Sequence, residues 1–272
     1  MPTASVDGVR MHWLEAGSGE PVVVLLHAFP LHAGMWQPQL EGLSGGCRVV
    51  APDLLGFGGS DAPDDPAAYS VERWADGVAA LLDHLGLDGV VLAGLSMGGY
   101  VAFAFLRRHR GRLAGLVLAD TRPGPDTSEV ASRRSAQAAQ VAAEGTARLI
   151  DTLLDGLLGE HTRAERPDVV EAARALMDNP ASGFIGALDA MKRRPDSTSD
   201  LASIDVPTLV VVGEEDGASP PEVARKMAEA IPGATLAVIP GAGHLSSLEV
   251  PEAFNREVGA LVGRRQQRRG PH

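Results

Sequence analysis

Cysteine is nearly absent from this chain, in which Cys47 is the only one among 272 residues. A single cysteine cannot form a disulfide within the chain, so a cross-linked scaffold is excluded and a reducing, cytoplasmic environment is favoured. Because Cys47 begins the apolar stretch at residues 47–51, we expect its thiol to be a small buried group rather than a reactive one.

Long hydrophobic runs and an excess of positive charge are also missing. No apolar stretch approaches the roughly 20 residues that span a bilayer, and residues 1–5 lack the basic and apolar segments of a secretion signal. The sequence therefore predicts no membrane association. The formal net charge of −11 argues against nucleic-acid binding, which requires a basic face.

What the chain has instead is an alternation of apolar and amphipathic stretches. The largely apolar stretches lie at residues 22–26, 47–51, 90–93, 113–119, 206–212 and 235–239. Strands that helices cover on both faces have such a pattern. Between them, residues 71–85 have helical spacing of apolar side chains, with Ser70 as N-cap and Gly86 as stop. An Asp7-Gly8 turn indicates a hairpin near the start. The order predicts an α/β fold with a mostly parallel sheet flanked by helices.

The pattern changes between residues 121 and 201, where strand signals vanish. Residues 136–158 and 169–177 look helical and are rich in Ala, Arg and Glu. We therefore expect a core domain from residues 1–120 and 202–263, interrupted by a helical cap at 121–201. Residues 264–272 form a basic C-terminal tail to which we assign no function.

The most informative short motif is Gly94-Leu95-Ser96-Met97-Gly98, between the predicted strand at 90–93 and a helix at 100–108. It matches G-x-S-x-G, a strained turn that presents a serine hydroxyl at the start of a helix. The two glycines suit a backbone that doubles back where a Cβ would collide. We therefore predict that Ser96 is a nucleophile.

A serine nucleophile needs a base that takes its proton and a carboxylate that orients the base. His244 follows the last strand in a loop of small residues, so we predict that it is the base. Asp216 follows the strand at 206–212 and is the favoured acid. Asp120, at the end of the preceding strand, is the alternative, whereas Asp53 comes before Ser96 and is expected to be structural.

The negative oxygen of a tetrahedral intermediate needs two backbone N–H donors. Met97, directly after the nucleophile, is expected to supply one. The loop after the strand at 22–26 is expected to supply the other, from Phe29, because Pro30 has no N–H.

Several motifs together resemble the α/β-hydrolase superfamily. They are His27-Ala28-Phe29-Pro30, the segment 52–61 with its Gly56-Phe57-Gly58-Gly59-Ser60-Asp61, the Ser96 turn, residues 213–216 and Gly243-His244. The likeness is nearest to small capped serine esterases, enol-lactonases and cofactor-free haloperoxidase-type enzymes. It implies a fold with an inserted cap and chemistry that needs no metal or cofactor. Ala28 departs from the glycine usual in relatives and adds a methyl group to the loop that bears Phe29.

The resemblance implies an enzyme that hydrolyses small carboxylic esters or lactones through an acyl-enzyme. Ser96 excludes the dehalogenase and epoxide hydrolase branches, which have aspartate at this position. The alternatives are an enol-lactonase acting on an anionic lactone, a perhydrolase, and a non-catalytic ligand receptor. The oligomeric state is left open.

The substrate pocket is expected beneath the cap, with Phe29, Trp36 and Met97 near its floor and His32 near its mouth. Neutral short-chain esters are favoured over anionic lactones because the basic side chains in or beside the cap are expected to be solvated. These are Arg122, Arg133, Arg134, Lys192, Arg193 and Arg194.

Overall fold

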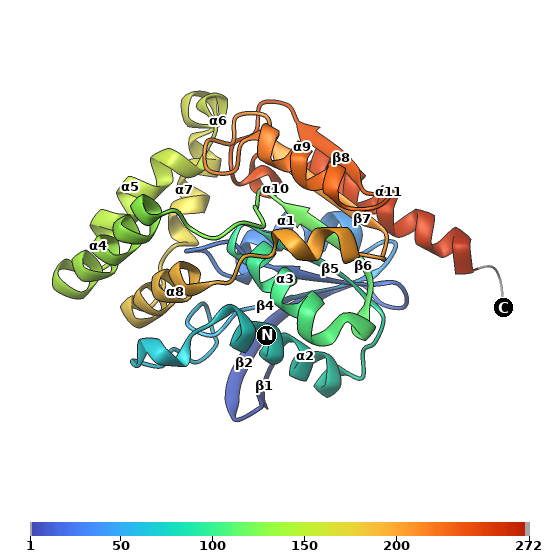
Figure 1. Cartoon of the computed structure of the whole chain (residues 1–272), viewed down its shortest axis with the longest axis horizontal. Helices are drawn as coiled ribbons and strands as arrows, with labels where there is room; N and C mark the ends of the chain where they lie inside the picture. Colours follow the sequence, from blue (N-terminus) through green and yellow to red (C-terminus); the bar gives the residue numbers. More distant parts are fainter. Residues whose placement is uncertain (1, 270–272) are drawn as a thin grey trace.

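The computed structural model describes residues 2–269 and contains one eight-stranded sheet (Figure 1). The strands are β1 (Thr3–Val6), β2 (Val9–Ala16), β3 (Val22–Leu26), β4 (Arg48–Pro52), β5 (Val90–Leu95), β6 (Leu113–Ala119), β7 (Thr208–Gly213) and β8 (Thr235–Ile239). Their order is β1-β2-β4-β3-β5-β6-β7-β8. Only β1 and β2 are antiparallel to their neighbours, so the predicted mostly parallel sheet is confirmed.

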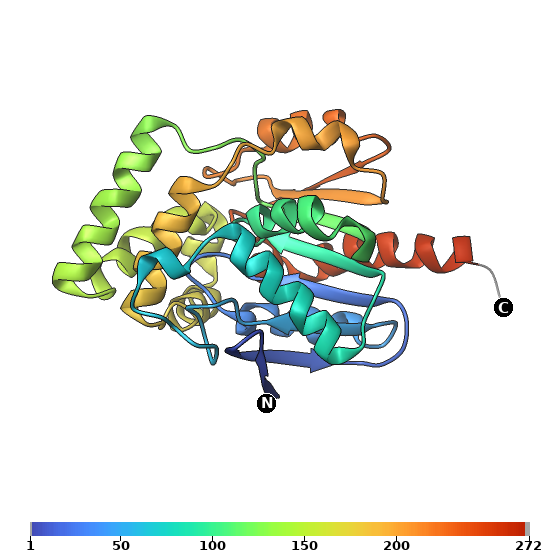
Figure 2. The ribbon, with the colours of Figure 1, turned by 60° about the horizontal axis from the view of Figure 1, so that its bottom comes forward.

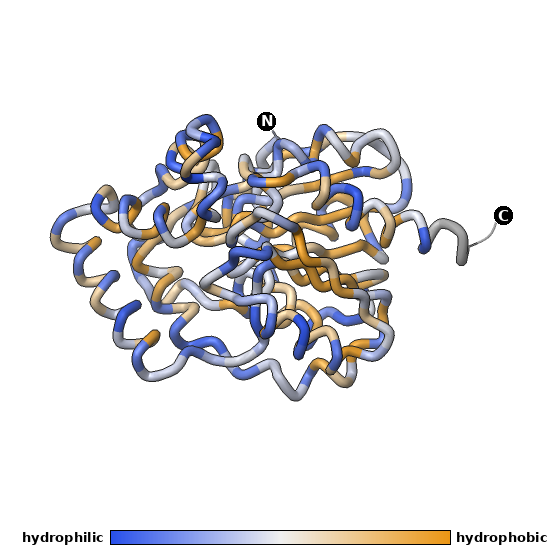
Figure 3. The backbone as a smooth tube through the Cα atoms, turned by 90° about the horizontal axis from the view of Figure 1, so that it is seen from above, coloured by the Kyte–Doolittle hydropathy of each residue, from blue (hydrophilic) through white to orange (hydrophobic). Residues whose placement is uncertain are grey.

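The centre of the sheet is buried on both faces. Every residue of β3, β5 and β7 is buried, and the tube in Figure 3 is hydrophobic along these strands. In the parallel register Leu26 pairs with Gly94 and Leu95 with Ala119. The loops that follow β3, β5 and β6 therefore leave the same edge of the sheet side by side.

Helices cover both faces of the sheet. They are α1 (Gln37–Leu43), α2 (Val71–Leu85), α3 (Met97–His109), α9 (Pro221–Ala230), α10 (Ser246–Glu249) and α11 (Pro251–Arg269), with 3₁₀ turns η1 (Ala33–Trp36), η2 (Pro66–Ala68) and η3 (Arg110–Arg112). Helices α2, α3 and α9 lie on one face, and α1 and α11 lie on the other (Figure 2). None of the described helices is long and apolar enough to cross a membrane.

Helix α2 has the predicted bounds because its local signals are strong. The Ser70 hydroxyl accepts a hydrogen bond from the backbone N–H of Arg73 (3.0 Å). Gly86 ends the helix with φ of 62°, a left-handed conformation that glycine adopts without steric cost. Caps of this kind satisfy backbone groups that the helix itself leaves unpaired.

The described chain between β6 and β7 contains helices and no strand. They are α4 (Ser128–Glu144), α5 (Ala147–Leu157), α6 (Glu160–Glu165), α7 (Pro167–Ala175), α8 (Ala181–Arg193) and the 3₁₀ turn η4 (Thr198–Ser203). The helical stretch predicted at 136–158 is two helices, because the chain turns at Gly145 with φ of 80°. Helices α4 to α8 gather at one end of the molecule, at the left of Figure 1.

The end of the chain differs from the sequence prediction. Helix α11 does not stop near Val262 but continues to Arg269, so the predicted basic tail at 264–272 begins inside a helix. The reason is that Arg and Gln have high helix propensity and no proline interrupts them. Residues 270–272 of the predicted tail lie outside the described residues.

Candidate functional site

Ser96 lies at the turn between β5 and α3 in a strained backbone conformation. Its φ is 55° and its ψ is −110°, a region that non-glycine residues seldom occupy. A Cβ at Gly94 would collide with the backbone of Gly98, and one at Gly98 would collide with the carbonyl of Leu26. The two glycines therefore allow β3, β5 and α3 to approach closely enough to form this turn.

Ser96, His244 and Asp216 form a continuous chain of hydrogen bonds. The His244 Nε2 atom lies 2.8 Å from Ser96 Oγ, and its Nδ1 atom lies 2.8 Å from Asp216 Oδ2. The other oxygen of Asp216 accepts hydrogen bonds from the backbone N–H groups of Ala218 and Ser219, each at 2.8 Å. These bonds hold the carboxylate in place after β7, opposite the histidine that follows β8.

Electrostatics in this chain favour an ionised Asp216. Burial raises the pKa of Asp216, but the charge and hydrogen bond of His244 outweigh it, so the net pKa is lowered. For His244, burial lowers the pKa, and the attraction of Asp216 more than compensates, so the net pKa is raised. An ionised carboxylate only accepts hydrogen bonds, so Nδ1 must carry the proton. The neutral ring therefore leaves Nε2 free to accept the hydrogen bond of the Ser96 hydroxyl.

Asp120, the alternative acid, is occupied elsewhere. It is completely buried at the end of β6, where Oδ1 accepts from the backbone N–H of Gly213 (2.8 Å) and Oδ2 accepts from the Ser246 hydroxyl (2.5 Å). Among the described residues it has no hydrogen bond to His244. Burial, followed by the nearby charge of Asp216, raises the pKa of Asp120 well above its usual range. The structure therefore brings Asp216, and not Asp120, against the histidine.

The two predicted oxyanion donors come shortly after the neighbouring strands β3 and β5. Met97 is the first residue of α3, and Phe29 is in the loop after β3, which pairs with β5. In the described part of the chain, neither backbone N–H has a hydrogen-bond acceptor. The two backbone N–H groups are therefore unpaired among the described residues, as the predicted role requires.

A polar network fixes the loop that carries Phe29. The buried His27 ring lies 3.0 Å from the Ala28 carbonyl through Nδ1, and its Nε2 accepts from the backbone N–H of Leu54 (3.0 Å). Burial lowers the pKa of His27 to about 4, so the ring is neutral and uses one nitrogen as donor and the other as acceptor. The hydrogen bond between Leu54 and His27 ties the loop after β3 to the loop after β4.

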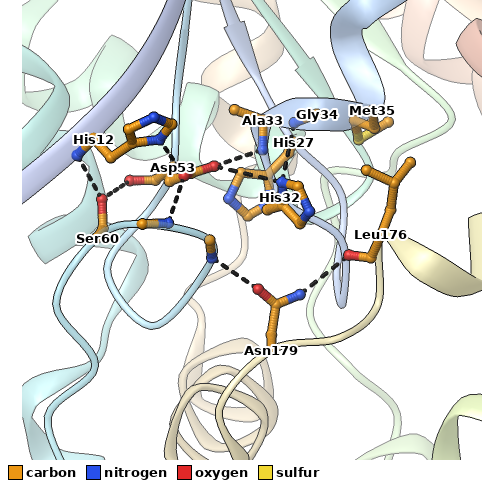
Figure 4. Close-up of polar contacts among 12 residues, drawn as sticks. His12, His27, His32, Ala33, Gly34, Met35, Asp53, Ser60, Leu176 and Asn179 are labelled. Atoms are coloured by element: carbon orange, nitrogen blue, oxygen red, sulfur yellow. Dashed lines mark hydrogen bonds and ion pairs between the residues drawn. The ribbon is translucent and has the colours of Figure 1, made fainter. Parts of the chain in front are cut away.

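Asp53 is the centre of this network, as Figure 4 shows. Its Oδ1 accepts from the backbone N–H of Ala33 (2.7 Å), and its Oδ2 accepts from that of Gly59 (2.8 Å) and lies 2.6 Å from His12 Nδ1. One buried carboxylate thus joins β2, the turn η1 and the loop after β4. This placement agrees with the structural role predicted for Asp53.

Asn179 is a residue of this site that the sequence analysis missed. Its Nδ2 donates to the Pro30 carbonyl (2.9 Å), and its Oδ1 accepts from the backbone N–H of Gly58 (2.7 Å). Figure 4 shows its further bond to the Leu176 carbonyl (3.2 Å). Asn179 lies between α7 and α8, so it links the helical insertion to the loop next to Phe29. The only local signal is a polar residue before Pro180, which is typical of any turn.

The structure places Trp36 and His32 away from the pocket predicted for them. Trp36 is completely buried and packs against Phe254 of α11, with ring centroids 5.9 Å apart. His32 caps η1, accepting from the backbone N–H of Gly34 (3.1 Å). Contact with Phe254 removes the large apolar surface of the Trp36 side chain from water, which stabilises this placement.

The cavity beside Phe29 has a volume of about 600 Å³. Its walls come from the segment after β6, from α4 and α5, and from the loop after β7, where Gly217 and Ala218 follow Asp216. Leu157 of α5 lines it and accepts, through its carbonyl, the backbone N–H of His244 (3.0 Å). The cavity therefore lies next to the hydrogen-bond chain of Ser96, His244 and Asp216.

A second link holds the insertion against the histidine loop. The buried Glu249 of α10 accepts from the Thr162 hydroxyl (2.7 Å) and from the backbone N–H groups of Gly159 (2.8 Å) and Leu245 (3.1 Å).

The described residues contain no group of three or more His, Cys, Asp or Glu side chains that could hold a metal ion.

Comparisons with known proteins identify the family of this chain. A family model for the alpha/beta hydrolase fold matches residues 21–251. A solved thermophilic esterase from Thermogutta terrifontis, with malate bound, is 40% identical with a TM-score of 0.92, over 97% of this chain and 98% of that one. The enol-lactonase from Burkholderia xenovorans LB400 is 30% identical with a TM-score of 0.89, over 96% of this chain and 100% of that one.

Curated relatives match over different lengths. The non-heme chloroperoxidase CPO-A1 from Kitasatospora aureofaciens is 32% identical over 93% of this chain and 95% of its own length. The chain spans only 36% of the length of epoxide hydrolase 2 from Siraitia grosvenorii, with 41% identity over 116 residues. The family model and the long matches confirm the resemblance predicted from the sequence motifs. This chain belongs to the alpha/beta hydrolase fold family.

Proposed function

We propose that this chain is a serine hydrolase that cleaves small carboxylic esters or lactones through an acyl-enzyme on Ser96. The family and its esterase and enol-lactonase members support hydrolysis of small molecules. The observation that carries the finer proposal is the hydrogen-bond chain, with 2.8 Å from Ser96 Oγ to His244 Nε2 and 2.8 Å from His244 Nδ1 to Asp216 Oδ2.

The first half of the reaction follows from these positions. Ser96 Oγ attacks the carbonyl carbon while its proton passes to His244 Nε2, and Asp216 stabilises the resulting imidazolium. The carbonyl oxygen becomes negative and accepts hydrogen bonds from the Phe29 and Met97 N–H groups. The carbon–oxygen bond to the alcohol then breaks, and the alcohol oxygen takes the proton from His244.

The second half repeats these steps with water. His244 accepts a proton from a water molecule, whose oxygen attacks the acyl carbon and forms a second tetrahedral intermediate. Its collapse releases the carboxylic acid and returns the proton to Ser96 Oγ. We propose that residues 121–201 act as a cap, which partly shields these intermediates from bulk water.

The direct test combines turnover with covalent labelling. A panel of short-chain esters, lactones and enol-lactones should be hydrolysed, and a serine-directed phosphonate should add one group per chain, on the peptide that contains Ser96. Labelling of another serine would refute the assignment of the nucleophile. Binding of the same compounds without any hydrolysis would instead favour a ligand receptor.

The activity is expected to rise with pH. Only neutral His244 accepts the serine proton, and Asp216 raises the pKa of His244 above its ordinary 6.5. The midpoint of the rise in kcat/KM should therefore lie above 6.5. Titration of a neutral ester from about pH 5 to about pH 9 measures it. A profile that is flat over this range, or one with its midpoint below 6.5, would contradict a histidine base paired with Asp216.

Perhydrolysis is a second candidate that one comparison favours, because the chloroperoxidase relative covers nearly the whole chain. Hydrogen peroxide would take the place of water in the second half and release a peroxy acid from the acyl-enzyme. The yield of peroxy acid from an ester and peroxide, relative to the yield of carboxylic acid, distinguishes the two reactions.

A further inference from the structure

The cavity beside Phe29 is positively charged although the chain as a whole is acidic. Its lining includes Arg122, Arg133 and Arg134 and contains no Asp or Glu side chain, whereas the formal net charge of the chain is −11. Apolar walls from Phe29 and Leu157 lie beside these arginines. Such walls lower the local dielectric and strengthen the attraction of an anion to the guanidinium groups.

One of the three arginines is already neutralised. Arg134 Nε lies 2.5 Å from Asp126 Oδ2, and Arg194 Nη1 lies 2.6 Å from Asp126 Oδ1. The Arg194 guanidinium also lies 4.0 Å above the Tyr100 ring. Asp126, which is buried, is thus shared by two guanidinium groups and leaves no acceptor for the other arginines of the cavity.

Arg122 has no partner in the described part of the chain. It makes no ion pair there, and its Nε is buried with no hydrogen-bond acceptor. A buried donor without an acceptor costs free energy, and native proteins seldom leave a charged group in this state. Arg133 of α4 likewise makes no ion pair or hydrogen bond through its guanidinium with any of the described residues. Two cationic side chains of one cavity are therefore free to bind an anion.

Arg122 is held close to the reacting atoms. The Thr121 hydroxyl donates to the Ser96 carbonyl (2.9 Å), so the residue before Arg122 is tied to the nucleophile turn. The cavity that Arg122 lines is also lined by Ala218, two residues after Asp216, and by Leu157, whose carbonyl accepts the backbone N–H of His244 (3.0 Å). An anionic group on Arg122 would therefore belong to a molecule that also reaches Ser96.

We propose that Arg122, with Arg133, binds a carboxylate of the substrate, so that the preferred substrates are small esters or lactones carrying a second, ionised carboxyl group. The planar guanidinium matches the two oxygens of a carboxylate, and both partners would be shielded from water by the cavity walls. This inference rests on the proposed function and identifies the substrate class of the same site. It reverses the expectation of neutral substrates, which assumed that these arginines are solvated.

The test compares two esters of equal size that differ in charge. Monoethyl adipate carries a carboxylate, and ethyl adipamate carries a neutral amide in its place. The wild type should have a kcat/KM about 10- to 100-fold higher for the acid, the factor expected for charge-assisted hydrogen bonds. Arg122→Met, which keeps most of the apolar stem, should abolish this preference, because it lowers kcat/KM for the acid far more than kcat/KM for the amide.

Three further variants test whether the preference depends on the positive charge at Arg122 or on positive charge elsewhere in the cap. Arg133→Met should lower the acid-to-amide ratio less than Arg122→Met, because Arg133 is exposed and screened by solvent. Arg122→Lys should retain part of the preference, since it keeps the charge but loses the planar fork. Arg163→Met, an exposed cap arginine outside the cavity lining, should leave the ratio unchanged. Thermal melting of each variant establishes that it is folded.

Binding supplies a readout that does not depend on turnover. In the background of Ser96→Ala, monoethyl adipate should bind more tightly than ethyl adipamate, and adding Arg122→Met should remove the difference. Equal hydrolysis of both esters by the wild type, or an equal loss for both in Arg122→Met, would overturn the carboxylate subsite and leave the hydrolase intact. If neither ester nor any member of the panel is hydrolysed, the proposed function fails, and the comparison of binding still decides the subsite.

Discussion

Ser96→Ala is expected to lower kcat by about 10⁶-fold, the scale of nucleophile deletion in a Ser-His-Asp enzyme. Without Oγ no acyl-enzyme can form, so any remaining hydrolysis must come from direct attack of water on a bound ester. The measurement is kcat for a short-chain ester, together with the mass of the chain after exposure to a phosphonate. The variant should carry no adduct.

The loss should be chemical rather than structural. Among the described side chains, the Ser96 hydroxyl is bonded to His244 alone. Alanine can adopt the same backbone angles at the same cost, so the melting temperature should change little. Ser18→Ala, at an exposed position between β2 and β3, is the matched control and should keep full activity. A folded Ser96→Ala protein that retains more than about one-hundredth of the wild-type rate would exclude Ser96 as the nucleophile.

Asp216→Asn is expected to lower kcat by about 10⁴-fold. The backbone N–H groups of Ala218 and Ser219 require an acceptor at Oδ1, so the new amide must turn its NH₂ group toward His244. An NH₂ group facing Nδ1 favours the tautomer with its proton on Nε2, which cannot accept the proton of Ser96. Loss of the negative charge also removes the stabilisation of the imidazolium.

Asp120→Asn is the matched control, because it also replaces a buried carboxyl group at the end of a neighbouring strand. Burial raises the pKa of Asp120, and the neutral carboxyl group that this favours resembles an amide in shape and charge. The amide oxygen can still accept from the backbone N–H of Gly213. We expect kcat to fall less than about tenfold for this variant, in contrast with the 10⁴-fold loss at Asp216. The opposite ranking of the two variants would make Asp120 the acid.

Features that depend on nearby residues could be read from the sequence. The Val- and Leu-rich strands, the Ser70 and Gly86 caps of α2 and the glycines around Ser96 each act through neighbours in the chain, so their structure follows from local sterics and hydrogen bonding. The strand and helix order then leads to the parallel sheet, since crossover connections between such elements have a single favoured hand.

Local sterics and hydrogen bonding could not settle whether Asp216 or Asp120 is paired with the histidine. Ala119 pairs with Val211, so both acids follow adjacent parallel strands and reach the same edge of the sheet. Local sequence is nearly equivalent for the two positions. Only the tertiary structure, which carries the His244 loop over β7 and places Ser246 against Asp120, assigns the histidine to one carboxylate and a hydroxyl to the other.

Local sequence likewise does not show which residues line the cavity or which of its charged side chains are paired. By itself, the sequence determined the family, the sheet and the candidate residues Ser96 and His244, with Asp216 as the favoured acid and Asp120 as its alternative, because these depend on short motifs at strand ends. It did not determine that Trp36 faces Phe254 or that Asn179 reaches Pro30. It also did not determine that Asp126 pairs with Arg134 and Arg194, so that Arg122 has no partner in the described part of the chain. Those contacts join segments far apart in the chain, and side chains acquire such partners only when the insertion packs against the core.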